Sequence, residues 1–170
     1  MVTAFKALLI GYGNVYCHDD GVAFYMINSL RSRWGLRELL PDEDGLDELG
    51  KEIDSVVLHQ LIPEIIPMVS RYRMVVFIDA HTGTISEEVR SIQVVEERRF
   101  HAVTHHMSPG MVLAMAREKN GKAPSAILVS VRGENFDFGL GLTDRCRQNA
   151  ETAVERLLDL FSGSVETKRD

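Results

Sequence analysis

Three short polar segments of the sequence carry side chains that could act together on a metal or on a water molecule. Asp19 and Asp20 come soon after a glycine turn, and Asp79 follows a very apolar run. His105 and His106 stand just before an expected helix start. Two carboxylates and an imidazole form an oxygen and nitrogen ligand set that suits a divalent transition metal with open positions. The same groups could position a water for hydrolysis.

Each of these segments also has an ordinary structural explanation. Asp19 and Asp20 could cap a helix and balance its dipole, and Asp79 could close an Asx-turn. The two histidines could be solvated in a loop. Because adjacent side chains in an extended chain point in opposite directions, we expect at most one of His105 and His106 to face a site. The three segments together favour a functional site more than any one of them does alone.

Apolar runs and turn signals predict the elements that would position these side chains. The predicted strands are 4–10, 53–59, 74–78, 91–95 and 125–131. Helical spacing predicts helices over 19–34 and 143–161, a weaker helix over 61–72 that Pro67 should shorten, and a helix that starts at Ser108 and Pro109. Strands that alternate with helices predict an α/β sandwich with a mainly parallel sheet.

The topology of such a sheet gives these segments a common location. In open α/β folds, sites collect at the carboxyl ends of the parallel strands. The segments 11–20, 79–83 and 138–141 all follow predicted strands. We therefore expect them to meet at one edge of the sheet.

Length and composition indicate a single globular domain. The chain has 170 residues, of which 45% are hydrophobic and 26% charged, as in ordinary soluble domains. We expect one domain over 1–163 and a frayed tail over 164–170. No apolar run is long enough to span a bilayer, and the N-terminus does not resemble a signal peptide. We therefore expect a cytoplasmic protein without membrane insertion.

Net charge and cysteine content narrow the classes of partner and of chemistry. The net charge of −6 argues against a nucleic-acid partner, because phosphate binding needs concentrated Lys and Arg. Cys17 and Cys146 are the only cysteines and form no C-x-x-C motif. We interpret them as two free thiols in a reducing compartment.

The glycine turn suggests a nucleotide site only weakly. Gly11 and Gly13 match two glycines of the dinucleotide fingerprint, but Tyr16 stands where the third glycine belongs. No acidic residue closes the second predicted strand, where a ribose ligand would be expected, and His59 stands there instead.

The motifs resemble, in their order along the chain, those of the [NiFe]-hydrogenase maturation endopeptidases. The segment 11–21 (GYGNVYCHDDG) is similar to the family's N-terminal signature, and 77–80 (FIDA) is similar to its second acidic motif. The segment 104–108 (THHMS) is similar to its histidine motif, and 139–143 (GLGLT) to its C-terminal loop. The matching segments are spread over nearly the whole chain.

This resemblance implies a function and a set of site residues. Members of the family remove a C-terminal extension from the nickel-loaded precursor of a hydrogenase large subunit. The nickel belongs to that precursor, and no permanent cofactor is expected in the protease. The implied metal contacts are Asp20, Asp79 and His105, with His106 as the alternative. Asp20 and Asp79 are the implied catalytic carboxylates of an aspartic-type endopeptidase, which we expect to be a monomer.

The resemblance also implies a fold, and two other functions stay open. The implied fold is a three-layer sandwich in which a twisted sheet of about five strands lies between helices. A chaperone of the same fold could bind nickel or the precursor without cutting it. The intact acidic and histidine motifs favour the enzyme, because a chaperone would be free to lose one of them. A nucleotide-binding α/β domain is the third possibility.

Overall fold

A five-stranded sheet forms the middle layer of the computed structural model, which describes residues 6–97 and 107–166. The strands are β1 (Ala7–Tyr12), β2 (Ile53–Leu58), β3 (Met74–His81), β4 (Val89–Gln93) and β5 (Ser125–Arg132). Their order across the sheet is β2-β1-β3-β5-β4. All neighbouring pairs are parallel except β4 and β5, which are antiparallel. The predicted α/β sandwich with a mainly parallel sheet is therefore confirmed.

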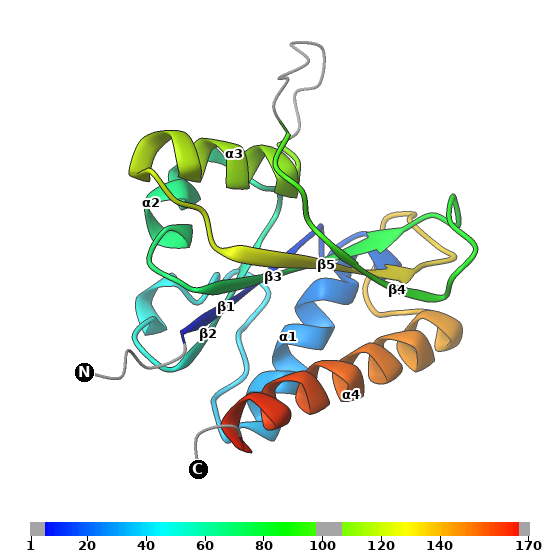
Figure 1. Cartoon of the computed structure of the whole chain (residues 1–170). Helices are drawn as coiled ribbons and strands as arrows, with labels where there is room; N and C mark the ends of the chain where they lie inside the picture. Colours follow the sequence, from blue (N-terminus) through cyan, green and yellow to red (C-terminus); the bar gives the residue numbers. More distant parts are fainter. Residues whose placement is uncertain (1–5, 98–106, 167–170) are drawn as a thin grey trace.

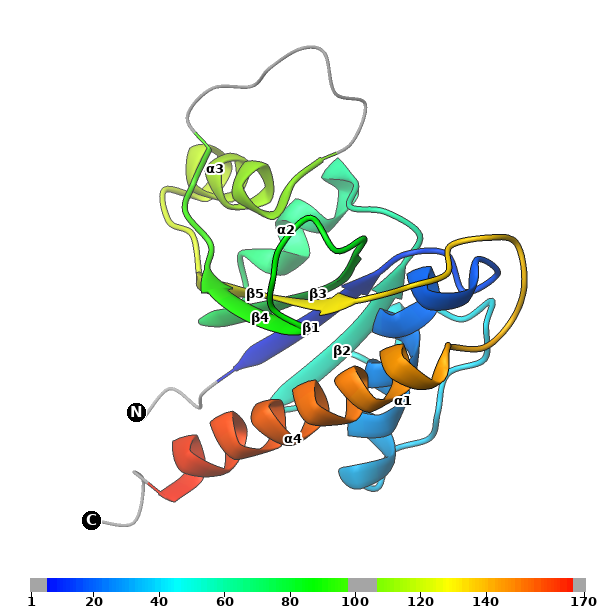
Figure 2. The same ribbon diagram turned by 90° about the vertical axis from the view of Figure 1, so that its right-hand side faces the viewer.

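Helices cover both faces of the sheet. The main helices are α1 (Val22–Arg33), α2 (Ile66–Val69), α3 (Pro109–Asn120) and α4 (Asp144–Glu166), and short 3-10 turns lie at His18–Gly21, Leu46–Glu48 and Pro63–Ile65. Figures 1 and 2 show α1 and α4 on one face and α2 and α3 on the other. No helix among the described residues is both long enough and apolar enough to cross a membrane.

Successive side chains of the central strands point to opposite faces of the sheet, so the apolar residues of each strand contribute to two separate cores. In β1, Leu9 packs in the core with α1 and α4, and Leu8 and Ile10 pack in the core with α2 and α3. All three side chains are fully buried. This double burial explains why the central strands are continuously apolar in sequence.

Two of the predicted helices differ in length from the structure, for reasons visible in the chain. The weak helix predicted over 61–72 is only a 3-10 turn followed by the four residues of α2, as the prolines indicated. The helix predicted from Asp19 begins at Val22, because His18–Gly21 forms a separate 3-10 turn. Both aspartates therefore lie before α1.

The other elements lie within a few residues of their predicted bounds: β1 and β4 are each shifted by about two residues, and α4 continues to Glu166, into the segment expected as a frayed tail. Ser108 caps α3 by accepting a hydrogen bond from the Met111 amide at 3.1 Å, and β4 lies at an edge of the sheet.

One further difference, at the end of β3, matters for the site. The strand continues to His81, so Asp79 lies inside it and is not the residue that follows it. The strand continues because β5 still pairs with it after β1 has ended, and Asp79 lies opposite Ser130.

Candidate active site

The carboxyl edge of the sheet carries a cavity of about 600 Å³ into which both predicted carboxylates face. Asp20 reaches it from the turn before α1, and Asp79 reaches it from the end of β3. The lining residues are Tyr12, Gly13, Asp20, His59, Gln60, Leu61, Asp79, Glu97, Met107, Ser108, Pro109 and Met111. The structure thus brings Asp20 and Asp79 together, although they lie 59 positions apart in the sequence.

The predicted histidines cannot be placed in the same way. His105 and His106 lie outside the described residues, so their relation to the cavity stays a prediction. The described chain resumes at Met107, and both Met107 and Ser108 line the cavity.

The glycine turn after β1 holds Asp20 in place. The Asn14 amide donates a hydrogen bond to Oδ2 of Asp20 at 2.6 Å. Gly13 has a φ of 140°, and a Cβ on it would lie 2.1 Å from the Asp20 carbonyl oxygen. Only glycine fits this close approach. The contact with Asp20 therefore explains why glycine stands at position 13 of this turn.

Asp79 is a carboxyl whose surroundings disfavour its charge. Burial raises the pKa of Asp79 to about 6, and the charge of Asp20 adds to this rise. Hydrogen bonds from the Ala80 amide and from the Tyr12 hydroxyl act in the opposite direction. A carboxyl with a pKa near 6 can take up and release a proton close to neutral pH, which suits a general acid or base.

Asp19 has the opposite environment although it is the neighbour of Asp20. Its side chain is fully buried. It accepts hydrogen bonds from the amides of Glu134, Asn135 and Thr143 at 2.8, 3.1 and 2.7 Å, and from the Thr143 hydroxyl at 2.8 Å. Burial alone would raise the pKa of Asp19, but these hydrogen bonds lower it below its usual value.

Asp19 therefore fixes the loop between β5 and α4 against the turn that carries Asp20. Further contacts close the same junction, since the His18 amide donates to the Gly139 carbonyl at 2.9 Å and the His18 ring hydrogen-bonds the Gly141 carbonyl at 3.0 Å. His18 adopts a φ of 44°, the only positive φ of a non-glycine residue in the described chain. Such a conformation persists where the surroundings determine it strongly.

Three further residues of the cavity were not predicted as site residues from the sequence. His59 follows β2 at the same edge of the sheet, and the strand-end rule could have identified it. Tyr12 ends β1 and contacts Asp79, but an aromatic residue at a strand end is no signal by itself. Glu97 lies in the segment after β4 and accepts a hydrogen bond from the Ser108 hydroxyl at 2.7 Å, which nothing in its local sequence indicates.

Both cysteines are free thiols, as predicted. Cys146 is buried in α4, and burial together with the nearby Asp19 raises its pKa to about 12. A thiol of this kind is inert. No group of three or more His, Cys, Asp or Glu side chains in the described part of the chain is close enough to hold a metal ion.

Comparison with solved structures shows what this architecture is similar to. The hydrogenase maturating endopeptidase HybD from E. coli matches with a TM-score of 0.67 at 20% identity over 94% of each chain. The [NiFe] hydrogenase maturation protease HycI from Thermococcus kodakarensis KOD1 matches with a TM-score of 0.61 at 18% identity over 92% of each chain.

The chain has the fold of the hydrogenase maturation proteases. An endopeptidase from Escherichia coli solved in solution also matches, with a TM-score of 0.63 at 21% identity over 94% of each chain. No protein-family model and no curated protein matches the sequence. The resemblance indicated by the sequence motifs is thus confirmed at the level of the fold.

The environment of Asp79 predicts that this carboxyl lowers the stability of the fold at neutral pH. Its folded pKa is above the unfolded value, so its favourable contribution is full below about pH 4 and is lost as the pH rises through about 6. Asp79→Asn should therefore raise the free energy of unfolding at pH 8 by about 1–2 kcal/mol. Urea unfolding in the presence of a chelator should show this gain shrinking toward pH 4. An equal gain in the free energy of unfolding at pH 8 and at pH 4 would contradict a raised pKa for Asp79.

The Asp19 carboxylate should stabilise the fold at neutral pH, in contrast to Asp79. Asp19→Asn places an amide NH₂ against backbone donors and should cost about 2–4 kcal/mol at pH 7. Because the folded pKa of Asp19 is lowered, its contribution is present above the unfolded pKa and is lost as the pH falls through the folded value. The two proteins should therefore converge in stability as the pH falls below about 4. Asp144→Asn, an exposed change in the first turn of α4, is the control and should cost less than about 1 kcal/mol.

Proposed function

We propose that this protein is an endopeptidase that removes the C-terminal extension from the nickel-loaded precursor of a [NiFe]-hydrogenase large subunit. The observation that carries the proposal is the pair Asp20 and Asp79, which face one cavity at the carboxyl edge of this particular fold. The fold supports the general role, because the similar structures are named as hydrogenase maturation endopeptidases.

In this proposal the precursor's nickel is part of the substrate. Asp20, Asp79 and His105, with His106 as the alternative, contact the nickel and so place the neighbouring peptide bond in the cavity. Two carboxylates and an imidazole suit a divalent transition metal with open positions, which leaves room for ligands from the protein that carries the metal.

The cleavage step follows from the properties of the two carboxylates. A water attacks the peptide carbonyl, and a carboxylate of the pair receives a proton from it as the C–O bond forms. The C–N bond then breaks, and the proton passes to the leaving amine. Before the precursor binds, burial raises the pKa of Asp79 to about 6, so this carboxyl can hold or release a proton near neutral pH. The aspartic-type assignment rests on this role.

Tyr12 acts in the proposal as a positioning residue for Asp79. Its hydroxyl donates a hydrogen bond to the Asp79 carboxylate. Burial and the charge of Asp79 raise the pKa of Tyr12 above its usual value, so the hydroxyl keeps its proton and remains a donor. This bond orients the carboxylate toward the cavity and tunes its basicity.

A cleavage assay on the nickel-loaded precursor tests the function and the site together. We expect wild-type protein and Asp159→Asn, an exposed change on α4 away from the cavity, to shorten the precursor by the mass of its C-terminal extension. Asp20→Asn and Asp79→Asn should each reduce the rate by at least about 100-fold. Of His105→Ala and His106→Ala, the first should be inactive and the second active.

Two outcomes would contradict the proposal. Cleavage at the wild-type rate by Asp20→Asn and Asp79→Asn would remove both carboxylates from the mechanism. Binding of the nickel-loaded precursor by wild-type protein without any loss of mass would instead establish a chaperone. A precursor prepared without nickel is the matched control for recognition, and it should remain uncut.

A further inference from the structure

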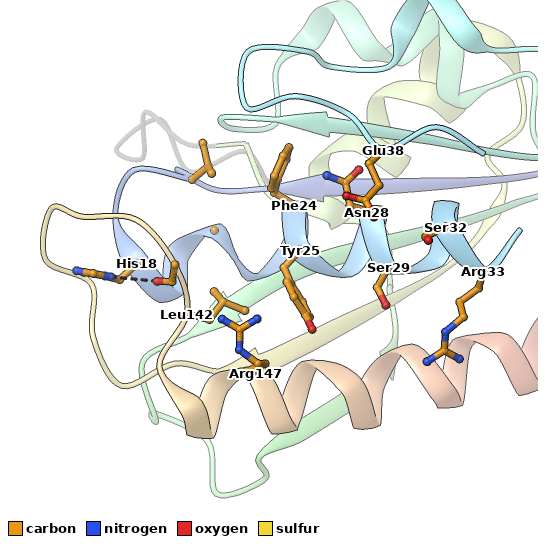
Figure 3. Close-up of a pocket in the computed structure, with 13 residues that line it drawn as sticks. His18, Phe24, Tyr25, Asn28, Ser29, Ser32, Arg33, Glu38, Leu142 and Arg147 are labelled. Carbon is orange, nitrogen blue, oxygen red and sulfur yellow. Dashed lines mark hydrogen bonds between the residues drawn. The ribbon is translucent and has the colours of Figure 1, made fainter. Parts of the chain in front are cut away.

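A second cavity lies along α1, on the other side of the turn that carries Asp20. It has a volume of about 410 Å³ and lies between α1, the start of α4 and the loop before α4 (Figure 3). The lining residues are Val15, His18, Gly21, Phe24, Tyr25, Asn28, Ser29, Ser32, Arg33, Glu38, Gly141, Leu142 and Arg147. Aromatic and aliphatic side chains therefore stand beside polar and charged ones.

This cavity is connected to the candidate active site through a third one. The intermediate cavity, of about 390 Å³, shares Gly13, His59 and Gln60 with the active site. It shares Val15 and Phe24 with the cavity along α1. The three cavities therefore adjoin one another through these shared residues, from the two carboxylates around the glycine turn to α4, and we term them together the α1 groove. A groove of this kind suits an extended chain better than a small molecule.

The far end of the α1 groove carries an arginine that forms no ion pair among the described residues. The Arg147 guanidinium lies 5.2 Å from the centre of the Tyr25 ring, beside Leu142 (Figure 3). The other arginines nearby are paired, since Arg33 bonds Glu155 at 2.8 Å and Arg145 bonds Glu88 at 3.0 Å.

An arginine that forms no ion pair and lies over an aromatic ring is suited to receive an anion. Arg147 also hydrogen-bonds the Tyr25 side chain, and a guanidinium has five N–H donors, so further donors can serve a carboxylate. The Tyr25 ring is held in turn, because its hydroxyl donates to the Glu151 carboxylate. In a chain with a net charge of −6, Arg147 is therefore a cation whose charge no carboxylate of the described residues neutralises in an ion pair.

We propose that the α1 groove binds a segment of the protein substrate that lies next to the cleaved peptide bond, with an apolar side chain beside Phe24 and a carboxylate on Arg147. This inference rests on the proposed function, because it takes the substrate of the same site to be a protein. Arg147 is then a determinant of substrate specificity that takes no part in bond cleavage. The carboxylate belongs to an acidic side chain or to the C-terminus of the substrate.

The test compares two neighbouring arginines on α4. Arg147→Gln should raise the KM for cleavage of the nickel-loaded precursor about tenfold and leave kcat unchanged. The KM of Arg147→Lys should lie between those of wild-type protein and Arg147→Gln, because lysine keeps the charge and loses the planar donor edge. Arg145→Gln, which removes an exposed arginine paired with Glu88 outside the groove, should keep the wild-type KM.

A second variant and a set of altered substrates identify the occupant. Ser29→Tyr fills the groove from α1 and should also raise KM. In a set of altered precursors, each acidic residue of the C-terminal segment is replaced by its amide, and in one further precursor the C-terminus is amidated. We expect one of these changes to raise KM for wild-type protein and not for Arg147→Gln. Such non-additivity is the signature of direct contact.

The possible failures can be told apart. If wild-type protein cleaves the precursor and Arg147→Gln has the same KM as Arg145→Gln, the groove inference is wrong and the function stands. If wild-type protein neither binds nor cleaves the precursor, both are wrong. A change in oligomeric state on Arg147→Gln, measured by sedimentation, would assign the groove to a second copy of this chain and overturn the proposal.

Discussion

The buried carboxylate of Asp19 is the interaction on which the arrangement of the site depends. It is completely enclosed and accepts four hydrogen bonds from the loop that precedes α4. A buried charge of this kind is tolerated only when its oxygens are satisfied. The turn before α1 and the loop before α4 are therefore fixed to each other. Asp20 and the start of the α1 groove both belong to this fixed unit.

The same edge of the sheet holds three aspartates in different environments. Asp19 is kept ionised by hydrogen bonds, so it acts as a structural anchor. Asp79 is shifted toward the protonated form because burial outweighs its hydrogen bonds. Asp20 is held by the Asn14 amide, with its position secured by the glycine beside it. One fold thus separates the carboxylate that supports the site from the carboxylates that face the cavity, a division typical of sites built for acid–base chemistry.

Most of the fold could be predicted from the sequence because the central strands are buried on both faces and the capping signals are strong. The residue at which β3 ends could not be predicted, because the pairing of Asp79 with Ser130 depends on β5, which lies far along the chain. The common location of Asp20 and Asp79 at one cavity could be predicted from motif and strand-end position. The role of Asp19 and the contribution of Glu97 could not, because both depend on contacts across the fold.

Nickel-edge X-ray absorption on this protein mixed with the nickel-loaded precursor that we propose as its substrate tests the central claim most directly. If Asp20 and Asp79 contact the precursor's nickel, complex formation should add oxygen ligands at about 2.0–2.2 Å, as for carboxylates on divalent metals of this size. Asp20→Asn and Asp79→Asn should each reduce that change. A spectrum that stays the same when wild-type protein is bound would contradict the account, because the nickel would then be recognised without these carboxylates.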